Sequence, residues 1–168
     1  MPLNLIKVYS ALLDIDYLSK QARDISLRGV FDRDFRHNSS LQLSGQSVYP
    51  VPGDPDALEQ LFFHLTTHEV PPKSRHREYE SERSRRLHWV RPHIEHTVPA
   101  NLIVFSNEEK GELRTFVVNK AERYLVVLKP LRKGGYYLLT AYSLGADSFR
   151  KVMNSYERTQ RAERRKRP

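Results

Sequence analysis

The spacing of apolar residues predicts a helix near the N-terminus. Its face, with i, i+3, i+4 and i+7 spacing, consists of Leu5, Val8, Tyr9 and Leu12. Asn4 precedes this face and is available as a cap. The periodicity then fails over residues 31–53, where polar residues, prolines and Gly45 predict a loop with at most a short strand at 41–43. We therefore expect residues 1–53 to form a helix followed by an irregular extension.

A second helix is predicted where Asp54 and Pro55 supply an N-cap and a proline at the first helical position. Its apolar stripe consists of Leu58, Leu61, Phe62 and Leu65. Residues 73–82 alternate in charge sign without apolar periodicity, which favours a solvated linker. The linker leads into a third helix that ends near Pro92 and carries Tyr79, Arg83, Arg86, Leu87 and Val90 on adjoining turns.

After Pro99 the period changes to the alternation typical of strands. Four runs joined by short polar links predict an antiparallel meander at 102–106, 113–119, 124–129 and 135–143. A final helix, capped by Asp147, carries the stripe Phe149, Val152, Met153 and Tyr156. The sequence thus predicts an α+β fold of N-terminal helices, a four-stranded antiparallel meander and a C-terminal helix. We expect one main domain over residues 54–157 and a frayed basic tail over 158–168.

Alternation in the last predicted strand places two groups of side chains on opposite faces. One group is Tyr136, Leu138, Thr140 and Tyr142, and the other is Tyr137, Leu139, Ala141 and Ser143. The hydroxyl of Thr140 and the phenol of Tyr142 could line a polar cleft. Equally, threonine is an ordinary strand former, and the tyrosines can pack on the core.

Composition favours a polyanionic partner. Lys and Arg total 28 and Asp and Glu total 20, which gives a net charge of +8. The absence of cysteine excludes disulfides, thiolate nucleophiles and cysteine zinc sites. No apolar run approaches the ~20 residues needed to cross a bilayer, and the N-terminus lacks a signal-peptide pattern. We therefore expect a cytoplasmic protein without a membrane partner.

The arginine-rich run at 83–96 carries the candidate chemistry. His88 can give or take a proton near neutral pH, and Arg83 and Arg86 can clamp one phosphate from adjoining turns. The alternative is that Trp89 belongs to the core, that His88 is a capping or surface residue, and that the arginines form a solvated face. Arg114 and Lys120 flank the second strand, where cations can contact phosphate or simply face water.

Histidine spacing raises a metal hypothesis. His64 and His68 are four residues apart, and His93 and His96 are three apart. There is no His-Glu-x-x-His motif and no evident carboxylate ligand beyond Glu69 or Glu95. We therefore expect neither a metal nor another cofactor.

Three runs carry a resemblance to a known superfamily. They are 83–94 (Arg-x-x-Arg-Leu-His-Trp-Val-Arg-Pro-x-Ile), 114–118 (Arg-Thr-Phe-Val-Val) and 136–142 (Tyr-Tyr-Leu-Leu-Thr-Ala-Tyr). With the order of elements, they resemble the phage- and mobile-element-associated branch of the nuclease superfamily that joins barnase, EndoU, the tRNase colicins and RelE-like toxins. The likeness covers residues 56–158 and leaves 1–53 unexplained.

The resemblance implies a metal-independent endoribonuclease, toxin-like or phage-encoded, that cleaves RNA through attack by the 2′-hydroxyl. Catalytic roles fall on His88, Thr140, Arg114 and Arg86, with Arg83 as the alternative to Arg86. The general base is not assigned: His88, Glu112 and Glu122 are the candidates. RNA contacts are expected from Arg83, Arg85, Arg91, Lys120, Tyr142, Arg164 and Arg165. Expected partners are RNA and a cognate antitoxin or immunity protein. The alternative function is a non-catalytic RNA-binding or inhibitor protein of the same origin that acts through its basic surface.

Overall fold

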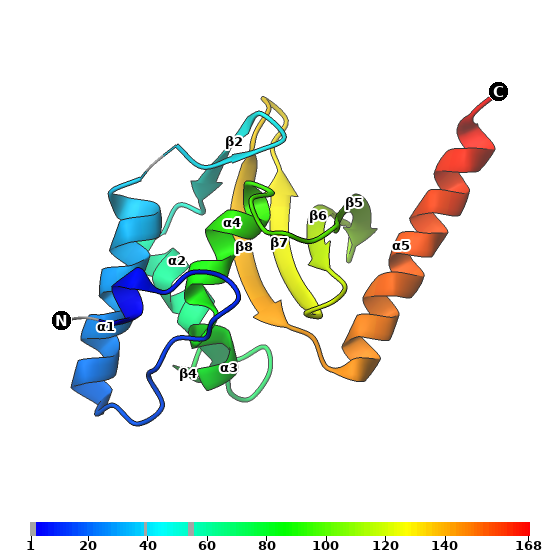
Figure 1. Ribbon diagram of the computed structural model, residues 1–168. Helices are drawn as coiled ribbons and strands as arrows, with labels where there is room; N and C mark the ends of the chain where they lie inside the picture. The colour runs from blue at the N-terminus through cyan, green and yellow to red at the C-terminus, as the bar shows by residue number, and fades with distance from the viewer. Residues whose placement is uncertain (1–2, 39, 54–55) are drawn as a thin grey trace.

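The computed structural model describes residues 3–38, 40–53 and 56–168, which form an α+β fold with helices on both sides of a curled sheet (Figure 1). The helical elements are η1 (Leu3–Ile6), α1 (Lys20–Phe31), η2 (Asp32–Arg36), α2 (Ala57–Thr66), α3 (Ser81–Ser84), η3 (Leu87–Trp89), α4 (Val90–Ile94) and α5 (Ala146–Lys166). The strands are β1 (Gln42–Leu43), β2 (Gln46–Pro50), β3 (Thr67–Glu69), β4 (Arg77–Tyr79), β5 (Leu102–Glu109), β6 (Glu112–Asn119), β7 (Tyr124–Pro130) and β8 (Tyr136–Ser143). Among these residues no helix combines the length and the apolar character that a membrane crossing requires.

The main sheet has six strands in the order β1-β2-β8-β7-β6-β5. Strands β5 to β8 are antiparallel neighbours, as the alternating runs predict. The prediction of a four-stranded antiparallel sheet is nevertheless wrong, because β2 pairs in parallel with β8, from Val48 opposite Tyr136 to Pro50 opposite Leu138. This pairing satisfies one edge of β8 with a strand from the N-terminal region, so the sheet is mixed.

The predicted N-terminal helix is also wrong. Only the turn of η1 forms there, and Val8 is 72% exposed. Asn4 holds the segment by side-chain bonds, donating to the carbonyl of Asp14 (3.0 Å) and accepting from its amide (2.8 Å). The long helix is α1, which starts after the cap Ser19 and buries Leu27, Val30 and Phe31. Its narrow apolar stripe explains why the sequence pattern did not reveal it.

The middle of the chain differs from the prediction in three ways. Asp54 and Pro55 lie outside the described residues, and the N-cap of α2 is Asp56, whose carboxylate accepts from the Glu59 amide at 2.8 Å. The predicted linker at 73–82 forms part of the antiparallel β3–β4 hairpin. The predicted third helix is divided into α3, η3 and α4, and it passes Pro92 because a proline in the first turn of α4 loses no intrahelical bond.

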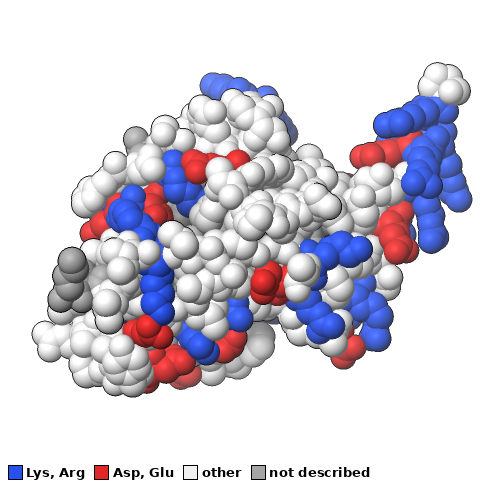
Figure 2. Space-filling model, in the orientation of Figure 1, with Lys and Arg blue, Asp and Glu red and all other residues white. Residues whose placement is uncertain are grey.

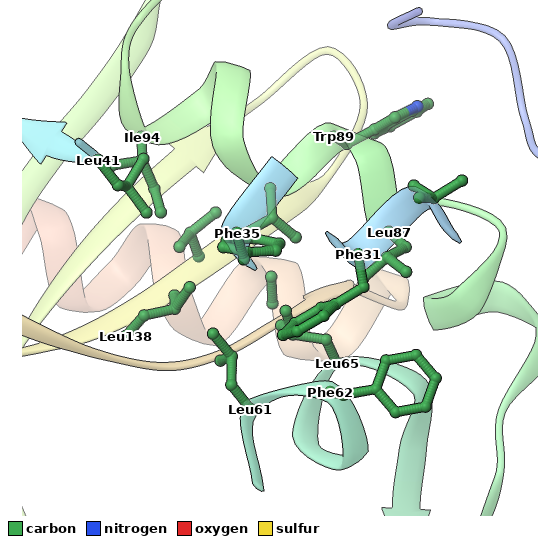
Figure 3. Close-up of a cluster of buried hydrophobic side chains, with 14 of the residues drawn as sticks. Phe31, Phe35, Leu41, Leu61, Phe62, Leu65, Leu87, Trp89, Ile94 and Leu138 are labelled. Atoms are coloured by element: carbon green, nitrogen blue, oxygen red, sulfur yellow. The ribbon is translucent and has the colours of Figure 1, made fainter. Parts of the chain in front are cut away.

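Most of the hydrophobic core lies between the helices and one face of the sheet (Figure 3). It contains Phe31 and Leu43 from the first 53 residues together with Leu65, Trp89 and Leu138 from the rest of the chain. The N-terminal extension is therefore an integral part of the core, and not an appendage.

A second cluster covers the opposite face of the sheet. Phe105, Phe116 and Leu125 pack there against the predicted stripe of α5, which includes Phe149 and Tyr156. α5 lies on the other side of the sheet from α1 and α2 (Figure 1). The tail expected to fray at 158–168 is helical as far as Lys166, and its last residues are exposed.

Strand β8 contains an irregularity that changes which side chains share a face. Leu138 and Thr140 pair with adjacent residues of β7, so one extra residue is accommodated between them. Leu138 and Ala141 both belong to the main core, whereas Leu139 and Tyr142 pack against the second cluster. The prediction that Leu138, Thr140 and Tyr142 share one face is therefore wrong.

Candidate functional site around Arg83

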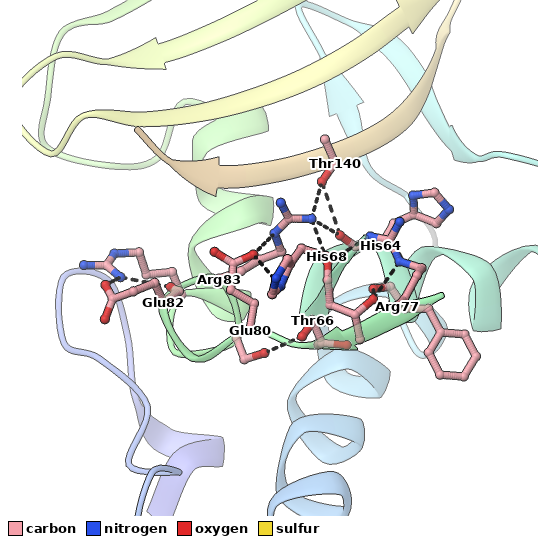
Figure 4. A network of polar contacts seen from close by, with 12 residues as sticks. His64, Thr66, His68, Arg77, Glu80, Glu82, Arg83 and Thr140 are labelled. Carbon is pink, nitrogen blue, oxygen red and sulfur yellow. Dashed lines mark hydrogen bonds and ion pairs between the residues drawn. The ribbon is translucent and has the colours of Figure 1, made fainter. Parts of the chain in front are cut away.

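Arg83 connects the C-terminal end of α2, the β3–β4 hairpin and β8 (Figure 4). Its Nη1 donates to the carbonyl oxygens of His64 and Thr67, each at 2.9 Å, and to the hydroxyl of Thr140 at 3.3 Å. The last carbonyls of a helix lack intrahelical donors, and Arg83 supplies one for His64. The side chain is only 13% exposed, so the guanidinium is held in one orientation.

The remaining guanidinium nitrogens of Arg83 differ in their contacts. Nε lies 3.3 Å from a carboxylate oxygen of Glu80, and the guanidinium carbon lies 5.2 Å from the centre of the Tyr142 ring. Nη2 donates no hydrogen bond to any described residue. Burial lowers the pKa of Arg83, Glu80 opposes that shift, and an arginine remains charged in a protein. Arg83 therefore offers a fixed cation with donors left for an anion.

His64 is one candidate for proton transfer. Burial lowers its pKa below the ordinary value of 6.5, and the charges of Arg77 and Arg83 lower it further. The imidazole is thus uncharged at neutral pH and can accept a proton. It lines a cavity of about 280 Å³ together with Leu138 and Leu139.

His68 and Glu80 form a second pair beside Arg83. Nδ1 of His68 lies 3.6 Å from a carboxylate oxygen of Glu80. At this distance the contact is within ion-pair range and is not a hydrogen bond. Figure 4 shows both side chains on the hairpin side of the Arg83 guanidinium, opposite Thr140.

Thr140 does not have the role that the sequence suggests. Its hydroxyl donates to the His64 carbonyl at 3.2 Å and accepts from Arg83. Because the hydroxyl proton is committed to a carbonyl, Thr140 positions Arg83 and does not donate to a ligand in this arrangement. The sequence predicts that Thr140 acts together with an arginine, and the arginine that its hydroxyl contacts is Arg83.

His88 lies in another part of the fold. It is 3% exposed, and its Nε2 is 2.8 Å from the carbonyl oxygen of Ala11 in the N-terminal segment. Burial lowers the pKa of His88 to about 4. No described contact joins His88 to Thr140 or Arg114, so the structure does not bring the predicted catalytic residues together. Trp89 also donates to Ala11 (3.1 Å) and is buried, as the alternative interpretation expects.

The predicted arginines next to His88 are occupied by internal contacts. Arg86 donates to the Glu82 carboxylate at 2.7 Å, and Arg85 lies 3.5 Å from the same carboxylate. Arg91 is 8% exposed and donates to the carbonyls of Asp34 and Asn38, both at 2.7 Å. These contacts anchor residues 34–38 to α4, so Arg91 is a structural residue.

The other predicted cations lie away from Arg83. Arg114 forms an ion pair with Glu112, which lowers the pKa of that carboxyl group. Lys120 is exposed at the turn between β6 and β7. Arg164 and Arg165 are exposed on the last turn of α5, where Figure 2 shows basic side chains gathered at the far end of the helix.

The site predicted from the sequence does not include His64, His68 or Arg77. The signal that the sequence offered was the spacing of the two histidines, and it indicated a possible pair of metal ligands. His64 lies on α2, but His68 lies on β3, so the two do not share a helix face. Within the described part of the chain, no group of three side chains is arranged to hold a metal ion.

Comparison of the chain with protein-family models, with curated proteins and with solved structures finds no significant match.

Proposed function

We propose that this protein is a metal-independent endoribonuclease whose reactive centre lies around Arg83. One observation carries the proposal: the buried guanidinium of Arg83 donates to the main-chain carbonyl of His64, whose imidazole burial and neighbouring cations hold uncharged, and its Nη2 donates no hydrogen bond to a described residue. Cleavage by the ribose 2′-hydroxyl needs a base, an acid and a cation on the phosphorane. The residues that we assign to these roles are His64, His68 and Arg83.

In the proposed reaction, His64 accepts the proton of the 2′-hydroxyl, and the 2′-oxygen attacks the adjacent phosphorus. The bond from phosphorus to the 5′-oxygen breaks, and His68 donates a proton to that oxygen. Nη2 of Arg83 binds the phosphate and stabilises the charge that develops on its oxygens. The products are a 2′,3′-cyclic phosphate and a free 5′-hydroxyl.

The wider setting of the proposal follows from charge and from the resemblance noted above. A net charge of +8 favours association with RNA. A toxin-like or phage-encoded nuclease would act on RNA in the cytoplasm and would harm the cell that makes it. A cognate antitoxin or immunity protein is therefore the second partner that we propose.

A second candidate is a non-catalytic RNA-binding or inhibitor protein. The observation that favours it is the internal use of the predicted catalytic groups: His88 is buried against Ala11, and the hydroxyl of Thr140 is bonded to the His64 carbonyl. In this case the basic surface would bind RNA, and Arg83 would serve only to join α2 to β8.

The two functions are separated by incubating the purified protein with total RNA in EDTA. The nuclease proposal expects cleavage with 2′,3′-cyclic phosphate ends, and a decrease of at least about a hundredfold in rate for His64→Gln and Arg83→Lys. The matched controls are His96→Gln and Arg132→Lys, which change exposed residues of the same types. Melting curves identify variants that fail to fold. Folded His64→Gln and Arg83→Lys variants that cleave at the wild-type rate would exclude this site, and retention of intact RNA would favour the binding protein.

A further inference from the structure

A groove of about 1150 Å³ lies between α1, α2 and the β3–β4 hairpin. Its walls carry cations from α1 and from the hairpin, and aromatic rings from α2 and β4. The cations are Lys20, Arg23, Arg75 and Arg77, and two of the aromatic rings belong to Phe63 and Tyr79. No predicted site residue lies in this groove.

Charge in the groove favours an anionic ligand. Its four lysine and arginine residues face two acidic residues, Asp24 and Glu78. Asp24 is paired with Arg28, which does not line the groove. None of the ion pairs found among the described residues involves Lys20 or Arg75, and both side chains are exposed. The groove therefore has cations available for phosphates.

Aromatic surface accompanies these cations. Phe63 is 39% exposed although it lies on α2 beside the buried Phe62. The guanidinium carbon of Arg23 lies 3.6 Å from the centre of the Tyr79 ring, which is a stacked arrangement. Unpaired bases stack on aromatic rings and on arginine planes, whereas the bases of a duplex are already stacked on one another. The combination selects single-stranded nucleic acid.

The groove borders the Arg83 site. The carbonyl oxygen of Thr67, a groove residue, accepts from Nη1 of Arg83 at 2.9 Å and from Nη2 of Arg77 at 2.8 Å. Phe63 in the groove wall immediately precedes His64 in α2. Arg83 and the groove residue Arg77 therefore share one carbonyl, so a strand that lies in the groove runs next to the Arg83 site.

We infer that the groove binds the single-stranded RNA segment flanking the phosphate held by Arg83. This inference rests on the proposed function for the identity of the ligand as RNA. Phosphates contact Lys20 and Arg75, and bases stack on Phe63 and on the Arg23 face opposite Tyr79. The groove thus supplies affinity for an unpaired strand, while Arg83 and His64 supply the chemistry.

The test measures binding separately from cleavage. The probe is a mixed-sequence 2′-O-methyl oligoribonucleotide of about 12 residues, within the range of single-strand site sizes, and it lacks the nucleophile for cleavage. Its affinity is measured by fluorescence anisotropy over a series of salt concentrations. Lys20→Gln/Arg75→Gln should reduce the salt slope by about 1.4, since each phosphate that a cation neutralises adds about 0.7 to the slope. Phe63→Ala should weaken binding roughly tenfold.

The matched control is Arg132→Gln/Lys133→Gln, which removes two exposed cations from the turn between β7 and β8. It should keep the wild-type slope within experimental error. Groove variants that bind the oligonucleotide like the wild type would overturn the inference. Equal affinity for a duplex of the same sequence would also overturn the inference. Tighter binding of a polyglutamate peptide than of the oligonucleotide would overturn it in favour of an acidic protein partner.

Failure of the nuclease proposal would give different results from failure of the groove inference. If the wild type leaves total RNA intact but the groove variants lose oligonucleotide binding, the groove stands as an RNA site without cleavage. If the wild type cleaves RNA and the groove variants keep both oligonucleotide affinity and KM, the nuclease stands and the groove is excluded.

Discussion

Arg83 donates to the hydroxyl of Thr140 across 57 positions of sequence, and the same hydroxyl donates to the carbonyl at the end of α2. The Thr140 side chain is therefore a bridge between α2, α3 and the central strand β8. The Thr140 hydroxyl contacts Nη1 of the Arg83 guanidinium, and the Glu80 carboxylate lies beside Nε.

Replacing Thr140 should separate positioning from catalysis. Thr140→Val removes both bonds, and we expect kcat to fall at least about tenfold because the guanidinium is no longer held in place. Thr140→Ser retains the hydroxyl and should restore most of the rate. Unchanged kcat in Thr140→Val, or an equal decrease in Thr140→Ser, would contradict the positioning role.

Buried His88 predicts a specific dependence of stability on pH. Its folded-state pKa is about 4, against an ordinary value of 6.5 for the unfolded chain. The unfolded state therefore binds a proton first, and the folded state loses stability as the pH falls from about 6.5 to about 4. The loss amounts to at most about 3 kcal/mol, since one pKa unit corresponds to ~1.4 kcal/mol.

The measurement is the free energy of unfolding in urea at several pH values for the wild type and for His88→Gln. The variant lacks this proton, so its curve should be flatter over that range. His64 and His93, whose pKa values are also lowered by burial, contribute equally to both curves and cancel in the difference. Parallel curves would show that His88 is accessible to protons in the folded protein.

Arg91 should be required for stability and dispensable for RNA binding. Lysine cannot reach two carbonyls and Glu95 with the same fork, so Arg91→Lys should cost roughly 2 to 4 kcal/mol of unfolding free energy. Arg85→Lys, at a half-exposed position, should change stability by no more than about 0.5 kcal/mol. An RNA affinity that falls for folded Arg91→Lys would restore the binding role that the sequence suggests.

Two adjacent glycines test the parallel pairing of β2 with β8. Gly134 and Gly135 both have φ near +90°, at +91° and +86°, where an added side chain costs about 1–2 kcal/mol. A Cβ on Gly135 would also lie 2.8 Å from the carbonyl oxygen of Ser47, whereas Gly134 has open space. Gly135→Ala should therefore destabilise the fold by at least about 1 kcal/mol more than Gly134→Ala. Equal effects in urea denaturation would argue against close contact between these strands.

Truncation after Arg161 tests the basic end of α5. The removed residues are exposed and lie beyond the apolar stripe, so the melting temperature should stay within a few degrees of the wild-type value. If Arg164 and Arg165 bind RNA phosphates, the salt slope should fall by about 0.7 for each phosphate that is no longer neutralised. An unchanged slope would assign the tail no part in RNA binding.

Local patterns in the sequence were sufficient to predict β5 to β8 and the apolar face of α5. Each of these elements shows a clear period, and turns of a few residues separate the strands. The pattern at Leu5, Val8 and Tyr9 was misleading because Leu5 and Tyr9 pack on the main core from a segment that is not a continuous helix, while Val8 is exposed. Parallel pairing of β2 with β8 joins segments almost ninety positions apart, as in the bond from Gly135 to Gln46, and no local period indicates it.

The candidate site depends on the same kind of long-range relationship. Thr140 and Tyr142 were identified from the last strand, but their partner Arg83 could not be distinguished from Arg86 by spacing alone. The role of His64 follows from burial and from the nearby charges of Arg77 and Arg83, which only the folded structure brings together. His88 stood out because it lies in the arginine-rich run, yet its burial against Ala11 makes it a poor proton donor.

The order of the strands has a consequence for the newly made chain. Among the described strands of this sheet, β8 is the last to leave the ribosome, yet it lies within the sheet between β2 and β7. Until β8 emerges, β2 has no parallel partner and Arg83 has no hydroxyl at Thr140. A nascent chain without β8 thus contains α2 and α3 but lacks the strand that helps to hold Arg83 in place. Synthesis itself therefore delays assembly of the site until β8 has been translated.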